Sequence, residues 1–69
     1  MNIAQLRMVL NISEYGIMYF NEKALYNLNQ LKEIDFIKQR EDKDWEITEK
    51  GKSFSNLILR YANDNIAVL

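Results

Sequence analysis

Two pairs of carboxylate side chains are spaced closely enough to act together. Asp42 and Asp44 lie two positions apart, and Glu46 and Glu49 follow shortly after them. Such pairs can hold a hard cation through their oxygens or work as a general acid and a general base. Here they fall in or beside a polar stretch that we expect to be an exposed turn, and no glycine-rich phosphate loop accompanies them. We therefore expect neither a metal site nor enzymatic activity.

The chain contains no cysteine and no histidine. Their absence removes disulfide bonds, the usual ligands of zinc, copper and haem iron, and the Cys–His and Ser–His pairs that activate a nucleophile. It also removes the side chain whose ordinary pKa lies nearest neutrality. The sequence thus predicts a protein without cofactor or metal, and the lack of cysteine suits the reducing cytoplasm.

A second set of side chains has the chemistry to bind nucleic acid. The carboxamides of Asn27 and Gln30 can each pair with adenine through two hydrogen bonds, and the ring of Tyr26 can stack on a base. Five cations can reach phosphate or guanine, namely Lys23, Lys32, Lys38, Arg40 and Lys43. Carboxylates interrupt the same region, and nine basic against ten acidic residues give a net charge of −1. Overall charge therefore provides no attraction to a polyphosphate chain.

The elements that position these side chains follow from hydrophobic spacing. Apolar residues recur at helical intervals from Asn2 to about Asn11, which predicts a first helix. Its polar residues, Gln5 among them, are expected to face solvent. Residues 13–16 have the composition of a turn, and residues 17–20 fit either a short strand or one helical turn.

The clearest helix is predicted from Asn21 to Ile34. Asn21 can cap it through its side-chain oxygen, and Glu22 lies at the positive end of the helix dipole. Asn27 and Gln30 fall outside its apolar face, so they are ordinary solvated residues unless they contact base edges. The apolar face follows the i, i+3, i+4 rule and consists of Ala24, Leu25, Leu28, Leu31 and Ile34.

Two segments with the aromatic and β-branched content of strands follow, Phe36–Arg40 and Trp45–Thr48. The polar residues 41–44 between them suit a turn, so the sequence predicts a β-hairpin. Thr48 can then cap a last helix, whose apolar stripe consists of Phe54, Leu57, Ile58, Tyr61 and Ala62. The final residues 66–69 are expected either to fray or to dock on a partner.

Length and composition indicate one small domain over residues 1–69. With 48% hydrophobic and 28% charged residues, the chain has the profile of a globular protein, and it is too short for two cores. The longest apolar run, residues 16–20, is far too short to span a bilayer, and no signal-like stretch opens the chain. We expect a cytoplasmic α+β domain, mostly helical, without a membrane partner. Since so small a core has no disulfide or metal to support it, a homodimer is the expected reinforcement.

The order helix, short element, helix, hairpin, helix resembles the winged-helix variant of the helix-turn-helix proteins. Residues Leu28–Ile37 resemble the end of the recognition helix in MarR- and PadR-type regulators, where leucines three apart precede a turn and the aliphatic residue that starts the wing. Asp35 and Phe36 stand where those regulators usually have a glycine before the aliphatic pair. Residues Trp45–Lys52 are similar to the stretch that closes the wing in these families, with Thr-Glu-Lys-Gly at the start of the next helix.

In that tetrapeptide the physical roles are plain. Thr48 caps the helix, and Gly51 lets its first turn pass close to neighbouring backbone. The resemblance covers about residues 22–58. Before residue 21 the chain departs from the families, because only residues 13–20 are available for the helix that usually precedes the recognition helix. That helix is either reduced to one turn or replaced by a strand.

The resemblance implies a small transcriptional regulator that binds double-stranded DNA. Its recognition helix, about residues 21–34, would enter the major groove, and its wing, about residues 36–48, would lie over phosphates or the minor groove. The DNA contacts implied are Lys23, Tyr26, Asn27, Gln30, Lys32, Lys38, Arg40 and Lys43. The alternative is a protein-interaction module, which fits the slight acidity better. Such a module would expose an apolar surface, at residues 15–20 or on the last helix, where DNA binding demands a basic stripe.

Overall fold

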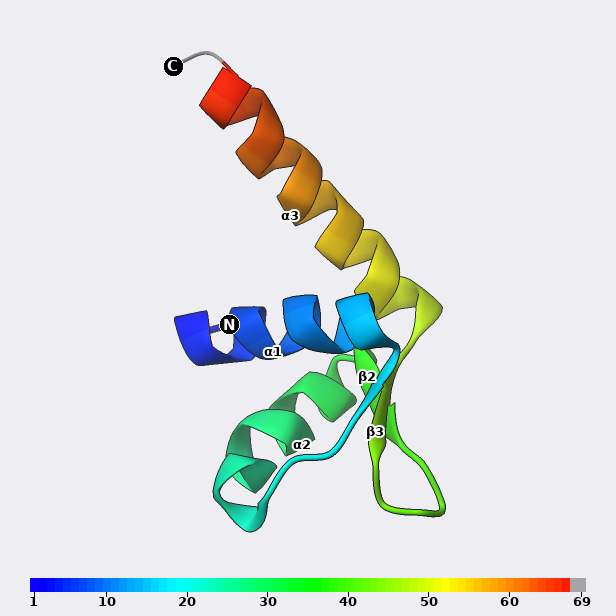
Figure 1. Cartoon of the computed structure of the whole chain (residues 1–69). Coiled ribbons are helices and arrows are strands. Elements are labelled where there is room, and N and C mark those ends of the chain that lie inside the picture. Colours follow the sequence, from blue (N-terminus) through cyan, green and yellow to red (C-terminus); the bar gives the residue numbers. More distant parts are fainter. Residues whose placement is uncertain (68–69) are drawn as a thin grey trace.

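The chain folds as helix, strand, helix, β-hairpin and helix (Figure 1). The structure is a computed structural model that describes residues 1–67, with side chains as far as Asp64. The predicted α+β, mostly helical fold with one β-hairpin wing is confirmed. Its elements in chain order are α1 (Ile3–Tyr15), β1 (Ile17–Met18), the 3-10 helix η1 (Glu22–Ala24), α2 (Leu25–Glu33), β2 (Ile37–Gln39), β3 (Trp45–Ile47) and α3 (Glu49–Ala67).

Helix α1 extends through residues 13–15, so the prediction of a turn at residues 13–16 was wrong except at its last residue. Ile12 is fully buried, and its burial gives the additional helical turn a place in the core. The helix ends at Gly16, whose φ of 81° is a conformation that glycine adopts at little cost. At the other end, Asn2 accepts a 2.7 Å hydrogen bond from the Gln5 backbone N–H, and Gln5 accepts one in return from the Asn2 backbone N–H.

The short segment after α1 is a strand rather than a helical turn. In β1, Ile17 lies opposite Glu46 and Met18 opposite Trp45 of the antiparallel neighbour β3. The sheet therefore has the order β1-β3-β2. A strand occupies the position of the helix that usually precedes the recognition helix, and a single helical segment, η1 with α2, separates β1 from the wing.

The predicted helix from Asn21 to Ile34 begins as the 3-10 turn η1 and continues as α2. The Asn21 side chain caps it by accepting a 3.0 Å hydrogen bond from the Lys23 N–H. At its end, the Phe36 N–H donates to the Leu31 carbonyl oxygen at 3.0 Å, while Asp35 adopts a φ of 64°. This is the Schellman arrangement that usually favours glycine. Asp35 thus has the left-handed backbone conformation that suits the glycine usually found at this position in MarR- and PadR-type regulators.

The wing turns over a three-residue loop at residues 41–43, which confirms the predicted turn. The Lys43 N–H donates to the Arg40 carbonyl oxygen at 3.0 Å, and the Arg40 N–H donates to the Asp44 carbonyl oxygen at 2.8 Å. Lys43 has a φ of 71°. This pattern is a type I turn followed by one residue in the left-handed region. The Asp42 carboxylate supports it by accepting a 3.0 Å hydrogen bond from the Asp44 N–H.

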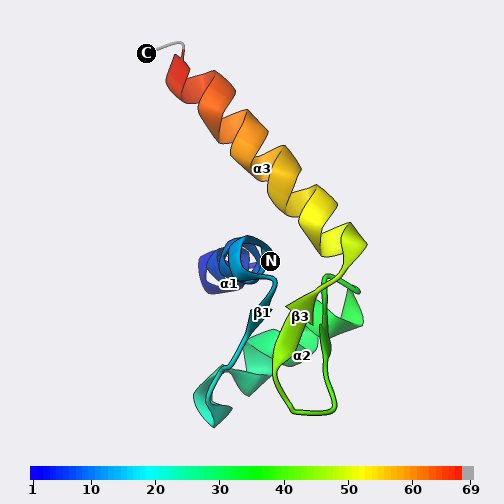
Figure 2. The same cartoon turned by 45° about the vertical axis from the view of Figure 1, so that its right-hand side comes forward.

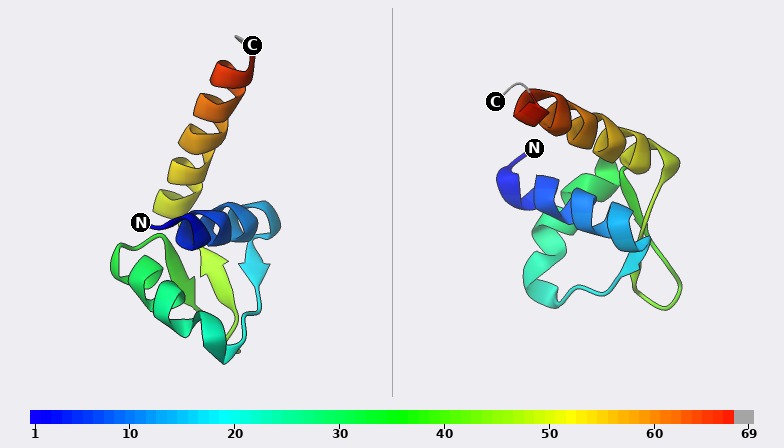
Figure 3. Two further views of the ribbon diagram at one scale, coloured as in Figure 1. Left: turned by 90° about the vertical axis from the view of Figure 1, so that its left-hand side faces the viewer. Right: turned by 45° about the horizontal axis from the view of Figure 1, so that its top comes forward.

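The apolar core lies between α1, α2 and the sheet, and among the described residues α3 adds to it the half-buried Phe54. Phe54 of α3 stacks on Phe36 with ring centroids 4.7 Å apart. Beyond this contact α3 projects away from the domain (Figures 2 and 3), giving a molecule of 43 × 21 × 18 Å. The buried apolar residues are Val9, Ile12, Leu28, Leu31, Phe36, Ile37 and Trp45.

Some residues of the predicted apolar faces lie outside this core. Ile3, Leu25 and Ile34 are exposed, because the helix surfaces that carry them extend past the elements available to cover them. The prediction that Gln5 faces solvent was wrong in the opposite direction, because Gln5 is only 4% exposed. The expectation for the side chains of residues 66–69 lies outside the described residues.

Candidate interaction surfaces

The two residues predicted to read adenine join α2 to α1. The buried Gln5 donates through Nε2 to Asn27 Oδ1 and to Gln30 Oε1, both at 3.1 Å. Gln30 in turn donates through Nε2 to the Tyr26 hydroxyl oxygen at 3.1 Å. Pairing with adenine needs the oxygen and the nitrogen of one carboxamide together. Both oxygens accept a hydrogen bond from Gln5, so in this structure the two side chains hold α1 and α2 together, and their predicted contact with adenine stays a prediction.

The other predicted contacts on this helical segment are exposed. Lys23 and Lys32 form no ion pair with any described residue, and Tyr26 leaves most of its ring in solvent. Glu22 and Glu33 are exposed beside them. The helix therefore presents cations and carboxylates interspersed, without a basic stripe.

The wing cations are largely neutralised within the wing. Lys38 Nζ lies 3.2 Å from a Glu46 carboxylate oxygen, and Arg40 Nε lies 3.4 Å from Asp42 Oδ2. Lys43 stands at the turn and has no ion pair among the described residues. Lys38 and Glu46 are also direct partners in the β2–β3 register, where opposite charges attract across the strands. A hairpin centred on residues 41–43 makes this pairing foreseeable from sequence.

An open groove lies between the residues that follow β1 and the wing, and we call it the aromatic groove. Its volume is about 300 Å³. Trp45 is buried beneath it, whereas Tyr19 is 74% exposed. Polar side chains from the turn before α2 and from the wing complete it. The full lining is Tyr19, Phe20, Asn21, Glu22, Leu25, Gln39, Lys43 and Trp45.

A second groove lies where the first turn of α1 meets α3, and we call it the terminal groove. Its volume is about 250 Å³, and no charged side chain lines it. Leu57 and Tyr61, on the same helix, are 62% and 69% exposed. The lining is Met1, Asn2, Ile3, Leu6, Phe54 and Ile58. Apolar surface is thus continuous from the start of α1 to the middle of α3.

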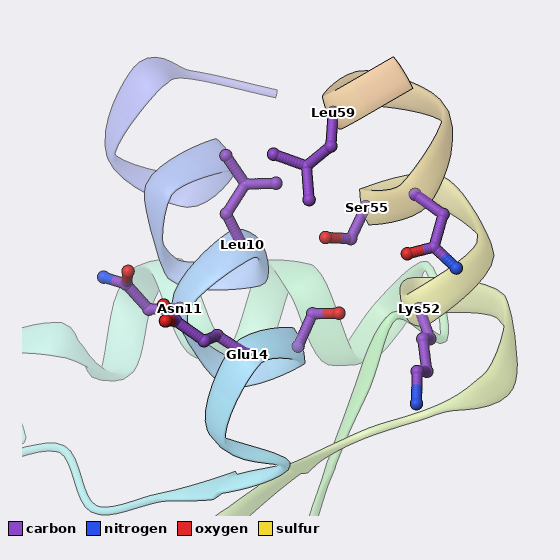
Figure 4. Close-up of a pocket in the computed structure, with 8 residues that line it drawn as sticks. Leu10, Asn11, Glu14, Lys52, Ser55 and Leu59 are labelled. Carbon is purple, nitrogen blue, oxygen red and sulfur yellow. The ribbon is translucent and has the colours of Figure 1, made fainter. Parts of the chain in front are cut away.

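A third and more polar pocket, of about 470 Å³, separates the rest of α1 from α3 (Figure 4). Glu14 and Lys52 line it from the two helices, with Leu10 and Leu59 at one end. Ser55 also lines the pocket, is 1% exposed, and its hydroxyl makes no hydrogen bond within the described residues. No group of three or more metal-ligating side chains is found among the described residues.

The three surfaces differ from the basic surface that DNA binding requires, and two of them are mainly apolar. No helix within residues 1–67 is both long and apolar enough to cross a membrane. Comparison of the chain with protein-family models, with curated proteins and with solved structures finds no match.

Proposed function

We propose that this chain is a winged-helix protein-interaction module whose aromatic groove binds an extended segment of another protein. The observation that carries the proposal is the exposed aromatic and aliphatic lining of that groove beside a wing whose cations are mostly paired. Binding pockets combine an apolar lining with a few polar groups that orient the ligand. Tyr19, Phe20 and Leu25 supply the apolar lining. Asn21 Oδ1 and Gln39 Nε2 already bond the Lys23 N–H and the Lys43 carbonyl oxygen, so the polar groups offered to a ligand are Asn21 Nδ2 and Gln39 Oε1.

Charge favours a protein partner over nucleic acid. From Glu22 to Glu46, the region that holds α2 and the wing, the sequence has five basic and seven acidic residues. Two of the three wing cations are already within 4 Å of a carboxylate. Affinity for DNA depends mainly on cations that neutralise phosphates, and this surface offers few. An apolar groove with a mixed polar rim instead matches the anatomy of protein interfaces.

An extended partner segment is favoured by the sheet. β1 is an edge strand, bound only to β3 among the described strands, so the backbone groups on its side away from the wing can pair with an extended segment that continues past Tyr19 into the groove. The exposed Tyr19 follows β1 directly, where it can contact the side chains of such a strand. Tyrosine is among the residues that dominate binding energy at protein interfaces.

Site-specific photo-crosslinking tests this proposal in cells. A photoreactive phenylalanine analogue at Tyr19 should give a discrete adduct with one protein, and Leu25→Asp should remove that adduct. The same analogue at the exposed Lys50 of α3 is the matched control and should give none. With the identified partner purified, Tyr19→Ala should weaken binding by about tenfold or more. Equal binding by Tyr19→Ala, or adducts at both positions alike, contradicts the proposal.

DNA binding by a regulator is the second candidate, because α2 and the tip of the wing lie at the same end of the molecule (Figure 1). Lys23, Lys32 and Lys43 are exposed and form no ion pair among the described residues. If these three bind phosphate, wild type should bind a random duplex pool at low salt and lose affinity as salt rises.

The variant that replaces all three lysines with alanine should then fail to bind the duplex pool. A variant that replaces Arg7, Lys50 and Lys52 with alanine has the same net charge and is the control. If wild type and the control variant bind the duplex pool and only the first variant does not, the result favours DNA over a protein as the partner. Absence of salt-dependent binding by wild type leaves the protein-binding proposal in place.

A further inference from the structure

Helix α3 continues well beyond the part of the domain that covers it. Among its residues up to Asp64, the buried ones, Gly51 and Ser55, lie in the first half, whereas Leu57 and Leu59 are exposed. The 19 residues of α3 measure about 28 Å at the standard rise per residue. Figure 1 shows the far half of the helix standing clear of α1, α2 and the sheet. Isolated helical turns are marginal in water, so this half needs a packing partner.

The surface left open on α3 joins the terminal groove. Leu57, Ile58 and Tyr61 follow helical spacing, and Ile58 lines the groove together with Ile3 and Leu6 of α1. A continuous apolar surface of this kind marks an interface. A partner that binds it must therefore present a complementary apolar surface of similar length.

We propose that the occupant is a second copy of this chain, with the two α3 helices packed antiparallel about a two-fold axis near Ala62. The charges beside the apolar stripe support this arrangement. Arg60 and Asp64 are four residues apart, yet neither forms an ion pair within the described residues. In an antiparallel pair the residue order is reversed, so each Arg60 lies opposite the partner's Asp64. The two-fold axis then generates two ion pairs at the edge of one self-complementary surface.

Interface size explains why the terminal groove belongs to this contact. With the axis near Ala62, residues 57–67 of one α3 lie opposite residues 67–57 of the other, a paired length of about 16 Å that presents roughly 160 Å² at a width of about 10 Å. A stable interface buries roughly 800 Å² on each partner. The antiparallel arrangement brings the far end of one α3 opposite Leu57 of the other, beside Ile58 and the α1 residues Ile3 and Leu6 that line the terminal groove with it. The remaining apolar area therefore comes from α1.

This contact is separate from the proposed function, because the aromatic groove lies between β1 and the wing and shares no lining residue with the terminal groove. Loss of self-association need not change the crosslink at Tyr19, and loss of that crosslink need not change self-association. The two proposals can therefore fail independently.

A charge exchange tests the pairing without depending on the stability of one variant. Arg60→Glu places like negative charges opposite each other in the homodimer, and Asp64→Arg places like positive charges there. Each variant alone should self-associate about tenfold more weakly than wild type. Mixed together they should form a heterodimer of near wild-type affinity, because the carboxylate introduced in one chain then lies opposite the guanidinium introduced in the other. Sedimentation equilibrium measures all three samples, and circular dichroism checks that each variant is folded.

Leu57→Asp tests the apolar part of the same contact. It should weaken self-association roughly a hundredfold, because a charge replaces an apolar contact on both chains. Asn63→Asp makes the same charge change at another exposed position of α3 and should leave the association constant within about threefold. A wild-type chain that remains monomeric at 100 micromolar, or two charge variants that fail to associate when mixed, overturns the proposal.

Discussion

The Thr48 hydroxyl donates a 2.6 Å hydrogen bond to the Asp35 carbonyl oxygen, although the two residues are thirteen positions apart in the sequence. The same hydroxyl oxygen accepts a 3.0 Å hydrogen bond from the Gly51 N–H. A third bond runs from the Thr48 N–H to the Phe36 carbonyl oxygen at 3.1 Å. One residue therefore connects the end of α2, the base of the wing and the first turn of α3.

Replacing Thr48 with valine tests this connection. Valine has the same shape but no hydroxyl, so it leaves the Gly51 N–H and the Asp35 carbonyl without that partner. We expect a loss of about 1–2 kcal/mol in the free energy of unfolding, the usual effect of removing a helix cap. Urea denaturation at a fixed protein concentration measures it. Thr48→Ser retains the hydroxyl and should stay within about 0.5 kcal/mol of wild type; equal losses in both variants would mean that the hydroxyl contributes nothing.

Gly51→Ala should destabilise the protein, although the same change inside a helix normally stabilises it by about 0.5–1 kcal/mol. A methyl group at Gly51 would overlap the Phe36 carbonyl oxygen and lie 2.8 Å from Ile47 Cδ1. The base of the wing must then move away from α3. We expect a loss of about 2–3 kcal/mol, the range found for overpacked cores. Asn56→Ala, at an exposed position of α3, is the control and should be neutral or stabilising.

Local signals in the sequence predicted most of the fold. Asn21 as a cap, the turn at residues 41–44 and Thr48 as a cap each depend on residues near one another in the chain. The close approach at Gly51 was predicted from the glycine itself, although the backbone that it approaches, at Phe36, lies fifteen positions earlier. The extent of α1 did not follow from such signals. Ser13, Glu14 and Tyr15 have turn composition, but the burial of Ile12 against distant elements keeps the helix intact. Tertiary packing outweighed local propensity there.

The interaction surfaces were harder to predict from the sequence than the fold. Asn27 and Gln30 have the chemistry to read bases, and only the packing of α1 on α2 shows that Gln5 occupies their oxygens. The sequence also did not predict that α3 projects from the domain, because Leu57 and Tyr61 follow the spacing of an apolar stripe that faces a core. Hydrophobic periodicity identifies an apolar face but does not say whether the same chain covers it.

Lys43→Gly should stabilise the wing. A residue with a Cβ atom pays about 1–2 kcal/mol in the left-handed conformation, and Lys43 adopts it at a φ of 71°. Glycine removes this cost but gains freedom in the unfolded chain, so we expect a net stabilisation of about 0.5–1 kcal/mol. Glu41→Gly, in the same turn but with no positive φ, should destabilise instead. Thermal unfolding of the two variants should therefore shift in opposite directions, and shifts of the same sign would contradict the turn geometry.

Ser55→Ala should also stabilise the protein. The Ser55 hydroxyl is buried and makes no hydrogen bond within the described residues. Removing this hydroxyl from water on folding therefore lowers the stability of the protein by about 1–3 kcal/mol. Alanine removes that cost and has the higher helix propensity, the latter by about 0.5 kcal/mol. Ser53→Ala, exposed two residues earlier on α3, gains only the propensity term. Urea denaturation should therefore show a larger gain at Ser55 than at Ser53, and the difference measures the cost of burying the hydroxyl. A loss of stability in Ser55→Ala would show that the hydroxyl has a hydrogen-bonding partner in solution.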